Sequence, residues 1–181
     1  MRRLRYGVAT SLDGFIAGPN GEYDWIVPDP SMDWAALWAQ FDAVLMGRLT
    51  YEVAKTRRAS LSGSGQQWIV VSRTLKPEDN PGITILSSDI TQAVSALKAQ
   101  PGKDIWLFGG GILFRFMLDA GLVDGIDLSV MPVLLGSGIP LLPEGGRRSL
   151  HLDTSKVLPS GILRLSYSVT LGSVTPEPSA H

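Results

Sequence analysis

One construction occurs twice in this chain and constrains its fold most: a short apolar strand, then glycine, then the start of a helix. Residues 43–46 are followed by Gly47 and a helical segment, and residues 105–108 run into three glycines and the apolar helical segment ILFRFML. Strands that alternate with helices favour an α/β fold with a mainly parallel sheet. The carboxyl ends of parallel strands meet at one edge of such a sheet, and ligands bind there.

The spacing of apolar residues predicts the remaining elements. We expect strands at residues 4–10, 15–17, 67–72 and 83–86, one helix that begins after Ser31, and another that begins after Ser88 or Asp89. Trp34, Leu37, Trp38 and Phe41 recur at the spacing of one face of the first helix. Segments 127–133, 150–157 and 163–171 look like strands without helices between them, which predicts an antiparallel C-terminal edge.

Composition indicates a folded protein with extensive burial. Of the 181 residues, 44% are hydrophobic and 18% are charged, and we expect one domain over residues 1–172 with a flexible tail at 173–181. The longest uncharged stretch, residues 128–143, is broken by prolines and glycines, so we expect no membrane span. A net charge of −1 gives no general attraction to nucleic acid. A cytoplasmic location is the simplest expectation.

The rarest residue types exclude several kinds of chemistry. The chain has no cysteine, which excludes thiol nucleophiles, disulfides and cysteine-rich zinc sites. It has two histidines, His151 and the terminal His181, and neither predicts a metal site or a catalytic triad. If the protein is an enzyme, a cofactor is expected to supply the reactive group.

Three strand ends carry groups suited to phosphate. A helix that follows glycine presents free backbone amides, and Arg48 and Thr50 add side-chain donors at the first junction. Ser72, Arg73 and Thr74 end another strand with two hydroxyls and a guanidinium, which would suit a 2′-phosphate and favour NADPH over NADH. Neither the P-loop motif nor the Rossmann glycine motif is present. Glycines at such turns can also be purely structural, and Arg73 can be a solvated strand end.

Two carboxylates are candidates for contact with a substrate. Asp13 lies in a turn between two strands, where an aspartate can instead bond its own backbone. Asp33 lies at the start of the tryptophan-rich helix, where an acidic residue also complements the helix dipole. Trp25, in the loop after Gly21, is a candidate for the wall of a ligand site.

Five segments together resemble the successive signatures of the dihydrofolate reductase-like family. They are SLDGFIA at 11–17, MGRLTYE at 46–52, VSRT at 71–74, FGGG at 108–111 and PVLLGSGIPL at 132–141. More narrowly, they are similar to stand-alone relatives of the reductase half of the bacterial riboflavin deaminase-reductase. The resemblance spans residues 4–170 and implies a three-layer α/β fold with helices on both faces of the sheet. It also implies an NADPH-dependent reductase that forms homodimers.

The same resemblance implies roles for individual residues. It places Ala9, Ile16 and Trp25 near the nicotinamide. The pyrophosphate would be held by Gly47, Arg48 and Thr50, and its other face by Gly109, Gly110 and Gly111. The 2′-phosphate would be held by Ser72, Arg73 and Thr74. One departure concerns the substrate: the riboflavin reductase has a glutamate where this sequence has Gly109.

The expected reaction is hydride transfer from NADPH to a C=N or sugar carbonyl carbon of a small heterocyclic substrate. The enzyme that the resemblance suggests most directly is 5-amino-6-(5-phosphoribosylamino)uracil reductase. We expect a water molecule positioned by Asp33 or Asp13 to supply the proton. A dihydrofolate or pteridine reductase and an NADPH-binding sensor without turnover are the alternatives. An acyl or phosphoryl transferase is disfavoured because no nucleophile and base are positioned for it.

Overall fold

The computed structural model describes residues 1–56 and 65–170, and the predicted tail at 173–181 lies outside them. Its strands are β1 (Leu4–Ser11), β2 (Phe15–Ala17), β3 (Phe41–Gly47), β4 (Gln67–Val71), β5 (Thr84–Leu86), β6 (Asp104–Gly109), β7 (Gly125–Met131), β8 (Ile139–Pro140), β9 (Leu150–Val157) and β10 (Leu163–Val169). Its helices are α1 (Trp34–Trp38), α2 (Arg48–Lys55), α4 (Ile90–Ala99) and α5 (Gly111–Asp119), with a 3₁₀ turn η1 (Pro77–Asp79). None of these helices is long and apolar enough to cross a membrane.

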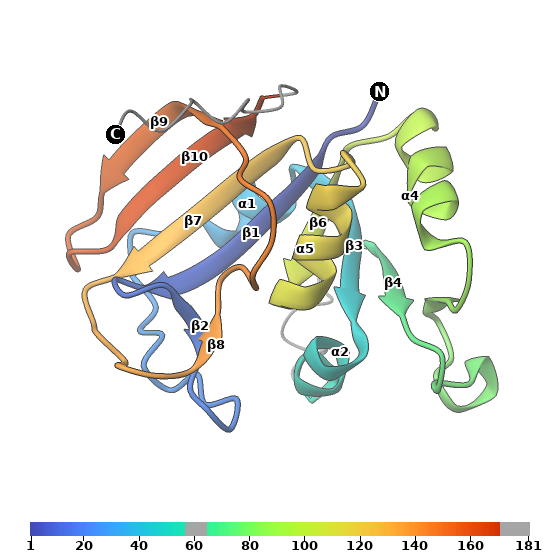
Figure 1. The fold of residues 1–181 in the computed structure, drawn as a ribbon, viewed down its shortest axis with the longest axis horizontal. Coiled ribbons are helices and arrows are strands. Elements are labelled where there is room, and N and C mark those ends of the chain that lie inside the picture. Colours follow the sequence, from blue (N-terminus) through green and yellow to red (C-terminus); the bar gives the residue numbers. More distant parts are fainter. Residues whose placement is uncertain (57–64, 171–181) are drawn as a thin grey trace, which may run out of the picture.

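Eight strands form the central sheet in the order β5-β4-β3-β6-β1-β7-β10-β9 (Figure 1). Neighbours from β5 to β7 are parallel, whereas β10 runs antiparallel to both β7 and β9. The predicted mainly parallel sheet with an antiparallel C-terminal edge is therefore confirmed. Its physical basis is that β9 and β10 are joined by a short turn, which permits only antiparallel pairing.

Two apolar layers cover the two faces of this sheet. On one face, α4 and α5 pack on a core that includes Tyr6, Leu45 and Leu107. On the other face, α1 and α2 pack on a core that includes Val44 and Trp106. Successive side chains of a strand point to opposite faces, so the buried strands are apolar on both sides. The predicted three-layer arrangement is confirmed.

Helix α1 differs from its prediction in both boundaries. Asp33 is its N-cap instead of Ser31, with Oδ1 accepting a hydrogen bond from the Ala36 amide at 2.8 Å. The helix ends at Trp38, and Phe41 is the first residue of β3. The prediction that Phe41 belongs to the helix face was wrong, because Phe41 satisfies its backbone by pairing with β6.

Ion pairs occupy the amino ends of the strands. Of the basic residues near the N-terminus, Arg2 and Arg5 form ion pairs with aspartates, so they do not form a free cationic patch. Arg5, for example, lies 2.8 Å from the Asp127 carboxylate and 4.9 Å from the centre of the Phe41 ring. The pairs are Arg2–Asp42, Arg5–Asp104, Arg5–Asp127 and Lys98–Asp124.

The two fully buried tyrosines differ in their hydrogen bonding. The Tyr6 ring stacks on Phe114 with 3.8 Å between ring centres, and its hydroxyl has no hydrogen-bond partner within residues 1–56 and 65–170. Burial raises the pKa of Tyr6. The Tyr51 hydroxyl, in contrast, donates to Asn80 Oδ1 at 3.1 Å.

We expect opposite effects when each hydroxyl is removed. Tyr6→Phe should raise the free energy of unfolding by about 1 kcal/mol, because it removes an unsatisfied buried polar group. Tyr51→Phe should lower it by roughly 1 kcal/mol, because it removes a buried hydrogen bond to Asn80 and leaves Lys55 as the donor to that oxygen. Urea denaturation measures both. Equal destabilisation by the two substitutions would contradict the difference in hydrogen bonding.

Candidate active site

Three of the predicted phosphate-binding segments lie side by side at one edge of the sheet. Strands β4, β3 and β6 are parallel neighbours, so their carboxyl ends meet there. The register pairs Val71 with Gly47, and Met46 with Gly109. The turn that begins at Ser72 and the two glycine junctions therefore follow one another at the strand spacing of about 4.8 Å.

The two helix starts approach each other through Thr50. A Cβ atom placed on Gly109 or Gly110 would lie 3.6 or 3.5 Å from Thr50 Oγ1, so the hydroxyl of α2 faces the glycines that precede α5. The N-caps of these helices are Gly47 and Gly110, and neither forms a side-chain cap hydrogen bond. The first-turn amides of both helices, at the positive ends of their dipoles, are thus suited to a shared anion.

The three consecutive glycines have different roles. Gly109 has φ +135°, which favours glycine, and the Gly109–Gly110 peptide is cis. A Cβ on Gly111 would lie 2.9 Å from the Pro140 carbonyl oxygen, so Gly111 is needed for close packing of the β8 segment on α5. Gly111 thus has a packing role, whereas Gly109, which is buried, and Gly110, which is half-buried, lie beside Thr50.

The two arginines at this edge differ in availability. Arg48 forms an exposed ion pair with Glu52 at 2.7 Å. Arg73 is exposed, and in the part of the chain that the structure describes it forms no ion pair or side-chain hydrogen bond. Its guanidinium can therefore bind an anion without first breaking another contact.

Ser72 and Thr74 shape the turn that carries Arg73. Ser72 is 7% exposed, and its Oγ accepts hydrogen bonds from the amides of Thr74 at 3.2 Å and Leu75 at 3.0 Å. The Ser72 hydroxyl therefore fixes the backbone of the turn and is largely shielded from solvent. Thr74 is exposed beside Arg73.

Two of the three residues predicted near the nicotinamide lie together. Ala9 and Trp25 pack against one apolar cluster, which includes Met131 and Leu158. The Trp25 Nε1 donates to the Glu22 carbonyl at 3.1 Å, which holds the indole against this cluster. Ile16 is half-buried in β2, which pairs with β8, and is not part of that cluster.

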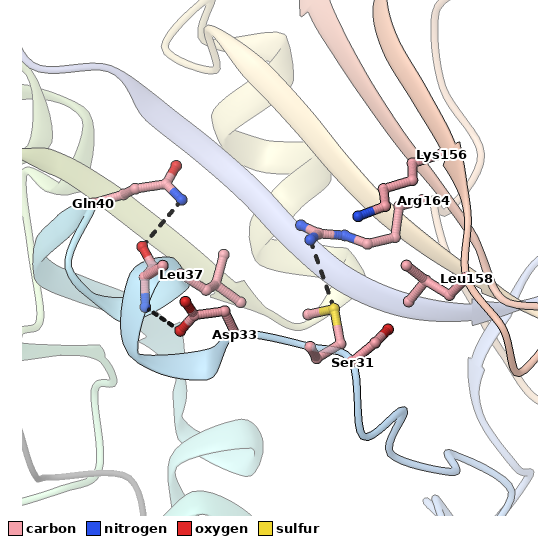
Figure 2. A pocket seen from close by; sticks show the side chains of 9 residues that line it. Ser31, Asp33, Leu37, Gln40, Lys156, Leu158 and Arg164 are labelled. Carbon is pink, nitrogen blue, oxygen red and sulfur yellow. Dashed lines mark hydrogen bonds between the residues drawn. The ribbon is translucent and has the colours of Figure 1, made fainter.

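A pocket of about 190 Å³ lies between α1 and the β9–β10 hairpin (Figure 2). Asp33 and Leu37 line it from the helix side, and Leu158 and Arg164 line it from the hairpin. Leu158 also belongs to the apolar cluster that Ala9 and Trp25 contact, so the pocket adjoins the predicted nicotinamide residues. Its size suits one ring or one polar head group, because sites for whole drug-sized ligands start at roughly 300 Å³.

Asp33 and Asp13 have different surroundings. Asp33 lines the pocket; its Oδ1 caps α1, and its Oδ2 has no hydrogen bond to another residue that the structure describes. The Asp13 carboxylate accepts hydrogen bonds from the amides of Leu135 and Gly136, the shorter at 2.7 Å. Hydrogen bonds from the Ser11 hydroxyl and from these amides lower the pKa of Asp13 to about 2. Asp13 thus anchors the loop after β7.

Asp29 was missed by the sequence analysis. It is 2% exposed, and it accepts hydrogen bonds from the Ser31 amide at 2.7 Å and from the Ser160 amide at 3.0 Å. It therefore fastens the segment before α1 to the turn between β9 and β10, which are the two walls of the pocket. The available signal was the turn-forming run Pro28-Asp29-Pro30-Ser31.

These anchoring carboxylates should make stability depend on acid pH. Hydrogen bonds from Ser160 and Ser31 lower the pKa of Asp29, as those to Asp13 do. A carboxylate with a lowered folded-state pKa stabilises the fold above its ordinary pKa of 3.8, and this contribution is lost as the pH falls toward 2.

We therefore expect Asp29→Asn and Asp13→Asn to be less stable than the parent protein at pH 7, with a difference that shrinks as the pH falls below 3.8. Urea denaturation across this range measures the difference. Asp24→Asn, in an exposed loop position, is the control and should change little at any pH. A difference that stays constant with pH would count against the anchoring role of the two carboxylates.

Comparison with known proteins identifies the family. Residues 2–163 match the RibD C-terminal domain. The chain is 36% identical over 179 residues to the uncharacterized protein YyaP of Bacillus subtilis strain 168, covering 92% of this chain and 94% of that protein.

Two solved structures show the same fold. A Shewanella sp. PV-4 protein named for riboflavin biosynthesis is similar with a TM-score of 0.79 and 26% identity, over 94% of this chain and 99% of that one. Dihydrofolate reductase from Enterococcus faecalis, solved with NADP(H), has a TM-score of 0.65 and 17% identity over 92% of this chain and 96% of that one. The latter likeness concerns the fold alone and confirms the predicted dihydrofolate reductase-like fold. The chain belongs to the RibD C-terminal domain family.

Proposed function

We propose that the chain is an NADPH-dependent reductase of a small heterocyclic substrate, similar to 5-amino-6-(5-phosphoribosylamino)uracil reductase of riboflavin biosynthesis. The observation that carries this proposal is the juxtaposition of two helix starts across Thr50, Gly109 and Gly110. Arg73 lies at the end of β4, the next strand after β3 along the same sheet edge.

The residues present fit a phosphorylated dinucleotide. Gly109 and Gly110 place no side chain between Thr50 and the start of α5, and the Thr50 hydroxyl and the helix amides can donate to a pyrophosphate. The guanidinium of Arg73, which has no ion pair among the described residues, can bind a 2′-phosphate in a bidentate manner. When bound, NADPH supplies the hydride, so the chain needs no thiol or histidine for the reaction.

The chain's own contribution at the reacting end is to position the substrate. Ala9 and Trp25 form one wall with the apolar cluster, and the pocket opens beside them. The Oδ2 atom of Asp33 can accept a hydrogen bond from a ring N–H or hold the water that delivers a proton. Asp13 acts indirectly, through the loop that it anchors.

Asp33 also favours a second candidate, a dihydrofolate or pteridine reductase, because a carboxylate at the start of this helix suits a pterin ring. The replacement of a substrate-binding glutamate by Gly109 favours a third, an NADPH-binding sensor without turnover. NADPH oxidation assays with dihydrofolate and with the phosphoribosylaminopyrimidine separate the three. We further propose that residues 1–172 act as one unit in the cytoplasm, without nucleic acid or membrane partners.

We expect the protein to bind NADPH more tightly than NADH. Arg73→Ala should weaken NADPH binding about tenfold or more, because it removes a charge-assisted hydrogen bond, and should leave NADH binding unchanged. Arg48→Ala is the matched control and should weaken both cofactors equally, since both carry the pyrophosphate. Fluorescence titration gives the dissociation constants. Similar affinity for NADPH and NADH would contradict the assignment of Arg73.

We also propose a homodimer formed through the outer face of β9 and β10. Leu150, Leu152 and Val157 of β9 are 42, 47 and 70% exposed, and by register they lie beside apolar residues of β10. Helix α4 lies at the other end of the sheet and α5 lies over its middle, away from β9 and β10 (Figure 1). An exposed apolar sheet face of this kind is typical of an interface.

Leu152→Asp should convert the dimer to a monomer, because it places a charge in the apolar face. Light scattering coupled to gel filtration measures the mass. Thr154→Asp is the control: Thr154 pairs with Ser166 and Leu152 with Tyr167, and the register shift between these two pairs puts Thr154 on the face opposite to Leu152. A dimer that survives Leu152→Asp would overturn this choice of interface.

A further inference from the structure

Two cations lie directly opposite each other at the antiparallel edge of the sheet. The register of β10 and β9 pairs Arg164 with Lys156, so both side chains leave the same face of the sheet. Figure 2 shows both extending from the hairpin toward α1 across the pocket. Asp33 lines the opposite side of this pocket.

This pair is not neutralised within the described residues. Arg164 contacts the Met32 sulfur at 3.6 Å, and neither cation takes part in any ion pair found in residues 1–56 and 65–170. Arg5, on the same sheet face, contacts two carboxylates. Like charges opposite each other destabilise a sheet, so the pair costs stability in the unliganded protein. Such a cost is expected where function requires the charges.

The sheet register relates the pair to the predicted nicotinamide residues. Ala9 pairs with Ser129, Ser129 with Arg164, and Arg164 with Lys156, so the four residues form one row across four strands. At a strand spacing of about 4.8 Å, Arg164 starts about 10 Å from Ala9, and Lys156 about 14 Å away. Their side chains share one face, because residues directly paired across strands point the same way.

We infer that Arg164 and Lys156 form an anion-binding subsite that selects an elongated substrate with a phosphate or carboxylate group. Arginine can bind such a group through two parallel hydrogen bonds, and lysine adds a second charge. Asp33 repels an anion from the opposite wall, which favours the cationic side for the anionic group. The strand register places Ala9 about 10 Å from Arg164, so the uncharged ring of an elongated substrate would lie toward Ala9. The description of the ligand as a substrate rests on the proposed reductase function, whereas anion binding does not.

Binding is tested by calorimetric titration of the unliganded protein with ribose 5-phosphate, with N-(4-aminobenzoyl)glutamate and with ribose. We expect one of the two anions to bind and ribose not to bind. Arg164→Gln and Lys156→Gln should each weaken binding about tenfold or more, and added salt should weaken it as well. Lys103→Gln, which neutralises an exposed lysine outside the pocket, should have no effect. Failure of both anions to bind would overturn the inference.

The cofactor edge must be distinguished from the pocket, because it also has groups that bind phosphate. Anion binding that is lost in Arg73→Ala but kept in Arg164→Gln would place the anion at the cofactor edge and overturn the inference. NADPH titration of the same variants separates the two proposals. Wild-type protein that binds the anion through Arg164 but does not bind NADPH would refute the reductase and retain the subsite.

The unfolding temperature of the variants distinguishes a binding role of the two cations from a structural one. Without ligand and at low salt, Arg164→Gln and Lys156→Gln should unfold at the same temperature as the parent protein or at a higher one, because each relieves repulsion. Added anion should raise the unfolding temperature of the parent protein more than that of the variants. Variants that unfold earlier yet bind the anion normally would show that the pair is structural.

Discussion

The parallel register of β3 with β6 is the interaction on which the candidate site depends. It brings the end of each strand to the same level, so two helices that are far apart in sequence begin next to each other. Thr50 can face Gly109 and Gly110 only in that register. A shift by one residue would turn every side chain of a strand to the other face, and both apolar cores prevent this.

The antiparallel edge extends the same sheet into a surface of different character. One face of β9 and β10 is polar and lines the pocket, and the other is apolar and exposed. The single row from Ala9 to Lys156 therefore connects the predicted cofactor end to a cationic wall. Asp29 holds the two sides of the pocket together, because it joins the segment before α1 to the turn of the hairpin.

Local signals predicted most of the fold. Apolar runs bounded by glycine and proline located the strands, and the lack of helices after residue 125 predicted the antiparallel edge. Helix α1 was harder to predict, because Ser31 hydrogen-bonds to Asp29 and leaves the cap to Asp33. The amide partners of Asp13 lie more than 120 residues away in sequence, so no local pattern could reveal them.

The sequence by itself determined the class of sheet, the positions of the glycine junctions and the exclusion of cysteine chemistry, because these follow from periodicity and residue type. Only the tertiary structure decided which polar groups are already paired. It left Arg73, Arg164 and Lys156 without carboxylate partners among the described residues, and it assigned Asp13 and Asp29 to loop anchoring. The physical reason is that pairing depends on strand register and long-range packing, which bring together residues distant in the chain.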